Sequence, residues 1–420
     1  MNLILRKNIF SIIMLLFFSM SVIGSISCSS GNDKTITFLH FCSGAQERKA
    51  LENLIVDFER KNNCEVNLLY YDYTKGPNEL ISIIKGKQLC NVLAIKSEWL
   101  AQIQSNGLLA GFSEVQNNDT AYYNFLMEYC KDGGKLYCLP WLVNTRLIYI
   151  NRKITDENKI EKSPKDFQFL LNYSELINNR GKYYGCGLVG PNKQAMLKNM
   201  MPLIFSFGGT LIDSAGKLDV SKNINSAGLY YYLKLSHSCF IETKREIENQ
   251  FIKGNIAYCI SDLSLLQKII EKNLLHDFII EQIPKNGSTP GISYSDAVML
   301  GVCSKSTNKE LALKFIKELA EWKTKNSFSI DFLKYGVPAQ KNYLFNFGGN
   351  FFDLSEAGIN SVLSKQIINS KSAPKNNRWF DIESIIEKEV EKAIYSEKSV
   401  EGSLKDAQEE ITNFLRRNKN

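Results

Sequence analysis

Short β-branched, apolar runs alternate with helical spacings along most of the chain, and this alternation constrains the fold more than any other feature. Residues 35–41 alternate as a strand, residues 46–62 carry apolar side chains at helical spacing, and residues 65–71 form the next expected strand. The same order returns after residue 147, and the chain ends in mostly helical residues 379–415. Repeated strand–helix–strand order builds a sheet covered by helices on both faces. The sequence therefore predicts an α/β protein with mostly parallel sheets.

Length and composition are those of an ordinary folded protein. The chain has 420 residues, of which 44% are hydrophobic and 23% charged, so two or three globular units with a sizeable core are expected. Its net charge of +7 comes from 51 basic and 44 acidic residues that are interleaved along the sequence. A nucleic-acid-binding protein would gather its basic residues on one face or in one segment. We therefore expect no nucleic-acid partner.

The first residues have the order of a secretory leader. Arg6 and Lys7 precede an apolar run over residues 9–23. That run is too short to span a membrane comfortably, and it ends in small residues before Cys28. The sequence therefore predicts export from the cytoplasm.

The same stretch resembles a bacterial lipoprotein signal peptide, in which a small residue precedes a cysteine that is then lipidated. The match is relaxed, because Ser25 stands where such signals usually have Leu. The resemblance implies a signal peptide over residues 1–27, a lipid on Cys28 and a polar tether over residues 28–34 that holds the protein at the membrane. Ordinary secretion with cleavage nearby is the alternative.

The sequence lacks the common motifs of catalysis and metal binding. Its three histidines have no HxxxH or HExxH spacing, no CxxC pair occurs, and there is neither a GxSxG elbow nor a Walker-type phosphate loop. Residues 185–190 satisfy GxGxxG, but the glycines fall inside an expected strand and Pro191 follows at once. A dinucleotide site needs these glycines where a strand turns into a helix. We therefore expect no enzymatic activity, no metal and no cofactor.

The cysteines offer no clear disulfide framework. Nine of them follow Cys28, and an odd number outside the cytoplasm leaves at least one without a partner in the same chain. Several lie in apolar runs, where cysteine acts as a small buried hydrophobe. Only Cys130 and Cys138 are placed to meet across a hairpin.

Three tryptophans stand near polar residues where strands or turns are expected to end. Trp99 follows Ser97 and Glu98, Trp141 follows a proline, and Trp379 lies beside amide and charged residues. The carboxyl ends of parallel strands line the ligand crevice of an open α/β sheet. A sugar needs a ring face for its CH surface and carboxylates or amides for its hydroxyls. The set fits a carbohydrate site, although any single tryptophan in such a place is more often a packed, half-buried residue.

A series of short markers runs along nearly the whole mature chain, at residues 36–40, 56–59, 91–95, 107–109, 132–140, 147–152, 163–167, 207–209, 251–257, 308–312, 336–339 and 399–407. In their order and spacing they resemble the extracellular solute-binding proteins of bacterial ABC importers, in the maltose-binding-like branch with sugar ligands. The resemblance implies a two-lobed periplasmic-binding-protein fold of type II, with the ligand in a cleft between the lobes. The first lobe would comprise residues 35–144 and 261–318, and the second residues 145–260 and 319–420.

The resemblance also implies binding residues by position. Ser97 and Glu98 stand where the family places hydroxyl-binding side chains, Asn144 stands at the first crossing between lobes, and Trp379 stands where a stacking aromatic is often supplied. Two departures from the family pattern add polar candidates around residues 261–264 and 294–296. The complete set of ligand-binding candidates is Ser97, Glu98, Trp99, Trp141, Asn144, Asp262, Tyr294, Asp296 and Trp379.

The function implied is capture of a sugar or oligosaccharide outside the cytoplasm and its delivery to ABC permease subunits in the membrane, by a protein expected to be a monomer. One alternative is a non-sugar polar or cationic solute bound by the same fold, for which Glu98, Asp262 and Asp296 would serve as counter-charges. A secreted enzyme is a second alternative, but it would need a nucleophile with a base or a pair of carboxylates with separated pKa values, and the sequence singles out neither.

Overall fold

The computed structural model describes residues 34–86, 90–112, 121–190, 195–211, 217–321, 328–341 and 358–418. By its contacts the chain divides into residues 1–35 and residues 36–420. The predicted signal peptide, Cys28 and nearly all of the predicted tether lie outside the described residues. Among the described residues, no helix has both the length and the apolar character that a membrane crossing requires.

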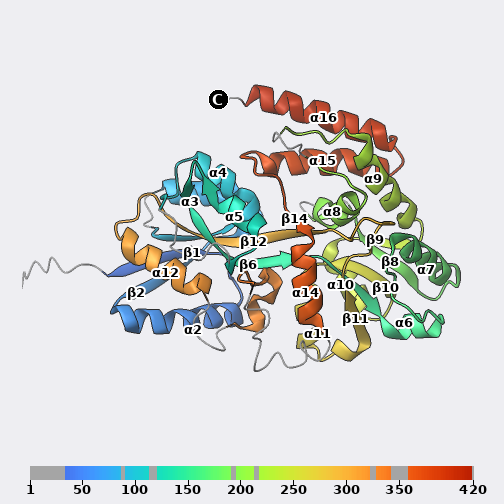
Figure 1. The fold of residues 1–420 in the computed structure, drawn as a ribbon, viewed down its shortest axis with the longest axis horizontal. Helices are drawn as coiled ribbons and strands as arrows, with labels where there is room; N and C mark the ends of the chain where they lie inside the picture. Colours follow the sequence, from blue (N-terminus) through green and yellow to red (C-terminus); the bar gives the residue numbers. More distant parts are fainter. Residues whose placement is uncertain are drawn as a thin grey trace, which may run out of the picture. The chain divides into compact units, whose positions relative to one another are not determined.

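The larger of two main sheets has the strand order β13-β6-β12-β3-β1-β2, and β14 pairs with β12. Figure 1 labels β1, β2, β6, β12 and β14 of this sheet. Its long strands β6 and β12 are buried along their whole length. The strands are β1 (Thr35–His40), β2 (Glu65–Tyr70), β3 (Val92–Lys96), β6 (Cys138–Thr145), β12 (Ser293–Val302), β13 (Val337–Pro338) and β14 (Ser370–Lys371).

The smaller sheet has the order β11-β7-β10-β8-β9, and a separate two-stranded ladder joins β4 to β5. Side chains of the central strands alternate between two apolar clusters, because successive residues of a strand point to opposite faces: Tyr149 belongs to one cluster, and Ile148 and Ile150 belong to the other. The strands are β4 (Lys131–Asp132), β5 (Lys135–Leu136), β7 (Leu147–Asn151), β8 (Tyr184–Val189), β9 (Cys239–Glu242), β10 (Ile256–Ser261) and β11 (Phe278–Glu281).

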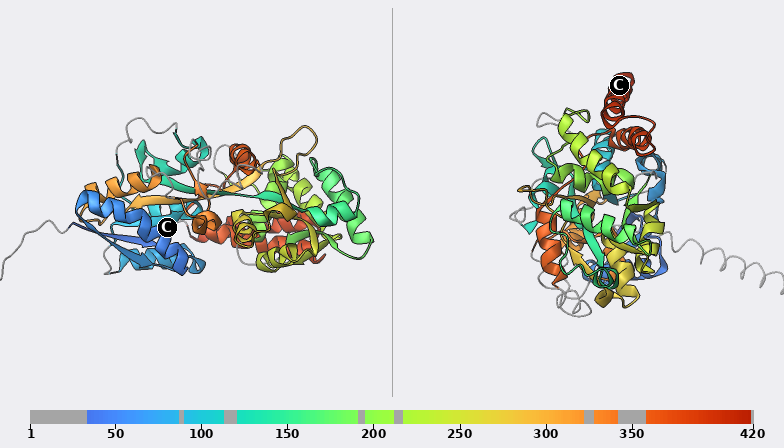
Figure 2. Two further views of the ribbon diagram at one scale, coloured as in Figure 1. Left: turned by 90° about the horizontal axis from the view of Figure 1, so that it is seen from below. Right: turned by 90° about the vertical axis from the view of Figure 1, so that its right-hand side faces the viewer.

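Helices lie on both sides of the strands, as the views in Figures 1 and 2 show. The α-helices are α2 (Ala45–Asn62), α3 (Pro77–Lys85), α4 (Leu100–Ser105), α5 (Asn124–Cys130), α6 (Arg152–Glu157), α7 (Phe167–Asn179), α8 (Met196–Ser206), α9 (Asn223–Ser236), α10 (Lys244–Ile252), α11 (Leu263–Glu271), α12 (Lys309–Glu321), α14 (Ile359–Ile368), α15 (Trp379–Ile394) and α16 (Val400–Arg417). Short 3₁₀ helices are η1 (Tyr73–Lys75), η2 (Ser97–Trp99), η4 (Leu275–Asp277) and η5 (Ile330–Tyr335).

Both sheets are mixed rather than mostly parallel. β1 pairs with β3 in parallel, but β12 runs antiparallel to both β3 and β6. In the smaller sheet β10 and β8 are parallel, whereas β7 is antiparallel to β10 and β11. β6 continues directly into β7, which carries the chain from the larger sheet into the smaller one. β12 then comes back between β3 and β6 and runs in the direction opposite to both.

Strand pairing also differs from the predicted lobe boundaries at three segments. β11 was expected in the first lobe but pairs with β7 of the smaller sheet, whereas β13 and β14 were expected in the second lobe but pair with β6 and β12 of the larger sheet. All three strands are short, so their partners depend on where the intervening loops lead and not on a sequence pattern of their own. The rest of the predicted division stays a prediction.

The glycines of the GxGxxG segment serve packing. Gly185 and Gly187 lie within β8, as expected from the sequence. A Cβ on Gly185 would sit 2.1 Å from the backbone oxygen of Ser174 in α7, and one on Gly187 would sit 2.6 Å from Ile247 of α10. The missing side chains therefore let two helices approach the strand closely, and no phosphate loop is formed here.

Cysteines in the described part of the chain carry no disulfide. None of these nine, which include Cys130 and Cys138, is joined in a disulfide, and seven of them are buried. The Cys130 sulfur instead lies 3.9 Å from the Met299 sulfur. The hairpin pairing considered from the sequence is therefore not formed.

Candidate functional site

A cleft of about 1160 Å³ lies where the two sheets meet. It is larger than the usual pocket for a small ligand, which is about 300 to 1,000 Å³. One wall is formed by the ends of β3, β6 and β12 with η1, η2 and η5, and the other by α8, α10 and the end of β10. The first two turns of α11 and α15 complete the lining. Most of the lining side chains are polar or charged.

Arg146 lies at the centre of the cleft, as the single residue between β6 and β7 where the chain passes from one sheet to the other. Its guanidinium is 2.8 Å from the Asp296 carboxylate and 3.9 Å from Asp262. It also lies over the Tyr294 ring, 4.8 Å from the ring centre. Burial disfavours the charged guanidinium, but the two carboxylates outweigh burial and raise the pKa of Arg146. Its charge is therefore fixed in place.

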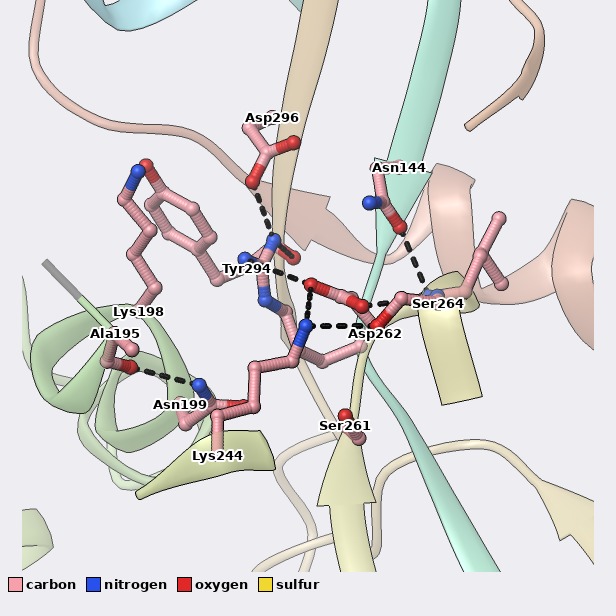
Figure 3. Close-up of polar contacts among 12 residues, drawn as sticks. Asn144, Ala195, Lys198, Asn199, Lys244, Ser261, Asp262, Ser264, Tyr294 and Asp296 are labelled. Carbon is pink, nitrogen blue, oxygen red and sulfur yellow. Dashed lines mark hydrogen bonds and ion pairs between the residues drawn. The ribbon is translucent and has the colours of Figure 1, made fainter. Parts of the chain in front are cut away.

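Asp262 and Lys244 form a second ion pair (Figure 3). The Lys244 ammonium is 2.7 Å from Asp262 and donates a hydrogen bond of 2.9 Å to the Ser264 hydroxyl. Asp262 also accepts a hydrogen bond from the Ser264 amide and so caps α11. Burial would raise the pKa of Asp262, but Lys244 and Arg146 outweigh it and hold that pKa well below its usual range. Asp262 is thus ionised and already has its cation.

Glu98 forms a third ion pair, with Lys198 of α8 across the cleft. Both side chains are nearly buried, with 5% and 12% of their surfaces exposed. The Glu98 Oε2 atom and the Asn199 Oδ1 atom are buried, and neither has a hydrogen-bond partner among the described residues. A buried acceptor without a donor is costly, so both positions favour a ligand or water that supplies O–H groups.

Asn144 connects the crossing strand to its surroundings. Its Oδ1 accepts a hydrogen bond of 3.1 Å from the Leu263 amide, and its Nδ2 donates one of 3.2 Å to the Lys334 carbonyl. The side chain thus joins β6 to the start of α11 and to η5. Asn144 lines the cleft as expected, although both ends of its amide are already engaged.

Of the nine predicted site residues, five line the cleft: Glu98, Trp99, Asn144, Asp262 and Asp296. Trp99 is only 2% exposed, so it offers little ring surface to a ligand. Whether any of the five binds the solute stays a prediction.

The other four lie outside the lining and have structural partners. The Ser97 hydroxyl accepts a hydrogen bond from the Ala297 amide, and Tyr294 lies under the Arg146 guanidinium. Trp141 packs against Phe38 and Phe332, and Trp379 is 1% exposed in an apolar cluster. Both tryptophans are thus packed, buried residues, which is the more common role of a tryptophan at such a position.

Sequence reasoning missed the aromatic side chain that α15 does bring to the cleft, which is Phe380. Its ring lies against Gly76, at the end of η1, where a Cβ would sit 2.6 Å from the ring. Neighbouring residues of a helix point about 100° apart, so Trp379 and Phe380 face different surroundings. The helical spacing of apolar residues in the sequence could have indicated this difference. Trp379, Ile382, Ile386 and Val390 form the buried stripe of α15, and Phe380 is not part of it.

The basic side chains of the cleft were missed as well. Arg146, Lys198 and Lys244 pair with three of the carboxylates that were predicted. Arg146 lies where the chain crosses between the sheets, and Lys198 and Lys244 lie on helices α8 and α10. No pattern in the sequence around these residues indicates a binding site. Among the described residues, no group of histidine, cysteine or carboxylate side chains is arranged to hold a metal ion.

Comparison with known proteins identifies the family. The family model for bacterial extracellular solute-binding proteins matches residues 53–344, which is more than half of the chain. The fold is similar to that of the sugar-binding protein MalE from Xanthomonas citri, at 14% identity and a TM-score of 0.77 over 92% of this chain and 98% of that one. 

Two further solved structures are similar over nearly their full length. The substrate-binding protein Lmo0181 from Listeria monocytogenes, in complex with cycloalternan, has 17% identity and a TM-score of 0.76 over 91% of this chain and 99% of that one. UgpB from Mycobacterium tuberculosis, in complex with glycerophosphocholine, has 17% identity and a TM-score of 0.76 over 92% of this chain and 99% of that one. The family match and the two-sheet fold with a central cleft agree, and the chain belongs to the bacterial extracellular solute-binding proteins.

Proposed function

We propose that this protein captures a sugar or oligosaccharide outside the cytoplasm and delivers it to the permease of an ABC importer. The observation that carries the proposal is the cleft itself: two buried oxygens without hydrogen-bond donors, on Glu98 and Asn199, lie among polar side chains held in place by ion pairs. Sugar hydroxyls donate and accept hydrogen bonds at close spacing, and the ring of Phe380 provides a face for the sugar's CH surface.

The charges in the cleft argue against a cationic solute. Such a ligand would need free carboxylates, yet Glu98, Asp262 and Asp296 are each paired with a lysine or arginine of the protein. Releasing one of them would leave a buried protein cation without its partner, which costs several kcal/mol. The sugar-bound structures among the similar proteins favour the same choice.

The role is binding rather than chemistry. Its family consists of binding proteins, and the carboxylates of the cleft are occupied by ion pairs. A residue that abstracts or donates a proton needs a pKa near the working pH, whereas Asp262 and Asp296 have pKa values held low, against the effect of burial, by the cations beside them.

Calorimetric titration with a panel of mono- and oligosaccharides tests the proposal. At least one sugar should bind the wild type, and Asn199→Ala should weaken that binding because it removes one of the two unsatisfied acceptors. Asn62→Ala, on the outer end of α2, is the matched control and should bind as the wild type does. If no sugar in the panel binds the folded wild type, the proposal fails.

Anchorage at the membrane through a lipid on Cys28 is part of the proposal and rests on the sequence of the leader. The mass of the mature N-terminus from cells that make the protein should show a diacylglyceryl cysteine. Cys28→Ser should be found in the soluble fraction or retain its leader. An unmodified Cys28, or a mature N-terminus elsewhere, would contradict the anchor without affecting sugar binding.

A further inference from the structure

Positive charge exceeds negative charge on the walls of the cleft. Among the described residues that line it, seven are basic and four are acidic. Three of the four carboxylates are held by Arg146, Lys198 and Lys244, as described above. The fourth, Glu248, is 2.6 Å from Lys268. The acidic side chains of the cleft are therefore fully used by protein cations.

Three basic side chains that line the cleft take no part in these four ion pairs. Lys334 turns to Glu47, which lies outside the cleft lining. Arg245 is exposed on the first turn of α10, where water solvates its charge. Lys96 remains: it is half-buried at the end of β3, and it forms no ion pair with any carboxylate in the described part of the chain.

Aromatic rings hold the Lys96 ammonium in the cleft. It lies 4.9 Å from the centre of the Tyr73 ring and 5.8 Å from that of Phe41. Contact with ring faces stabilises a cation but removes part of its hydration. Lys96 is paired with Val298 across β3 and β12, two residues from Asp296. Its charge helps Arg146 to lower the pKa of that carboxyl, but the ion pair of Asp296 is with Arg146. The ammonium is thus oriented, partly desolvated and available.

We propose that the solute carries an anionic group, a carboxylate or a phosphate attached to the sugar, and that Lys96 binds it. This inference rests on the proposed function, since it names the class of sugar that the same cleft accepts. A neutral sugar that displaces water from the cleft would leave the excess positive charge without compensation. An acidic sugar supplies the missing charge and still donates its hydroxyls to Glu98 and Asn199.

Calorimetry with matched pairs of ligands tests the inference. Glucose is compared with glucuronate and with glucose 6-phosphate, and galactose with galacturonate. Wild-type protein should bind an acidic member at least about tenfold more tightly than its neutral counterpart, as expected for one partly desolvated charge pair. The two kinds of acid separate a carboxylate-specific site from a phosphate-specific one. The preference should shrink as NaCl is raised from low to high concentration.

Variants of Lys96 test whether this side chain causes the preference for acidic over neutral sugars. Lys96→Met keeps the apolar stem against the rings and should bring the preference for the acidic member close to one, whereas Lys96→Arg should retain most of it. Lys49→Met removes the same charge from an exposed site on α2 and should leave the preference unchanged. Circular dichroism melting curves establish that each variant is folded.

Each outcome decides a different claim. Equal affinity for neutral and acidic sugars, or a preference that survives in Lys96→Met, overturns the anionic-solute inference and leaves sugar capture intact. Binding of inorganic phosphate or acetate as tightly as of the acidic sugars also overturns it. If neither neutral nor acidic sugars bind the folded wild type, sugar capture itself fails.

Discussion

The guanidinium of Arg146 contacts the Asp296 carboxylate at 2.8 Å, at the point where the chain leaves one sheet for the other. Arg146 is 3% exposed and Asp296 is 8% exposed, so the pair is shielded from water. Removing one member of a buried pair is more harmful than removing both, because the remaining charge is left without a partner.

A double-mutant cycle on this pair should show strong coupling. Arg146→Met is expected to lower the free energy of unfolding by about 3 to 5 kcal/mol, and the double variant Arg146→Met with Asp296→Asn by clearly less. Urea denaturation of the ligand-free protein measures both. Additive effects of the two single changes would mean that the contact contributes no coupling.

Adjacent residues of α15 should separate binding from stability. Phe380→Ala should weaken sugar binding by about 1 to 3 kcal/mol, as loss of an aromatic contact in a binding site does, with little change in unfolding. Trp379→Ala should instead lower the free energy of unfolding by about 3 to 5 kcal/mol, because it leaves a cavity in the apolar cluster. Calorimetry and urea denaturation on both variants test the pair. The reverse result would return the sugar-stacking role to Trp379.

The side-chain amide of Asn144, at the crossing between the two sheets, should stabilise the structure around it. In Asn144→Ala the Leu263 amide loses its acceptor, and a buried donor without a partner costs about 1 to 3 kcal/mol. Hydrogen exchange at the Leu263 amide should become faster, while exchange in α16 stays as in the wild type. Unchanged exchange at Leu263 would show that another acceptor takes over.

Glu383 gives a dependence of stability on pH. Burial raises the pKa of Glu383 to about 8, with Lys198 opposing the shift and Glu98 adding to it. Between the ordinary pKa of about 4.3 and this value, the folded state keeps a proton that the unfolded state releases, so the carboxyl destabilises the fold increasingly as pH rises.

The amide variant removes this cost. Glu383→Gln should melt at a higher temperature than the wild type at pH 8.5, and the difference should shrink as the pH falls toward 5. Glu397→Gln, at an exposed glutamate beyond the end of α15, serves as the control and should show no such trend. A difference in melting temperature that is the same at every pH would contradict the raised pKa.

The alternation of strands and helices predicted the first elements of the chain closely. The expected strands at residues 35–41 and 65–71 and the expected helix at residues 46–62 each differ by one residue from β1, β2 and α2. These elements are set by local periodicity. Strand direction was less accessible, because the partners of β12 and β11 depend on contacts between residues that lie far apart in the sequence.

Three of the four carboxylates of the site were predictable, and its cations were not. Glu98 lies two residues after β3, Asp262 directly follows β10 and Asp296 lies in β12, so their positions could be inferred from the fold that the resemblance implied. Glu248, on α10, was not predicted. Lys198 and Lys244 lie on helices of the other sheet, and only the packing of α8 and α10 brings them opposite. Lys96 is the last residue of β3, where a lysine is more often a solvated surface residue.

The larger apolar cluster contains Phe38 and Leu93 of the larger sheet together with Tyr149, Cys259 and Phe278 of the smaller one. This cluster therefore continues from one sheet into the other, and separating the two sheets would expose part of it to water. Fragments cut at the crossings would expose these surfaces and aggregate rather than fold separately. Thermal unfolding of the intact protein should accordingly be a single cooperative transition. A destabilising substitution in one half would then lower the melting temperature of the whole molecule.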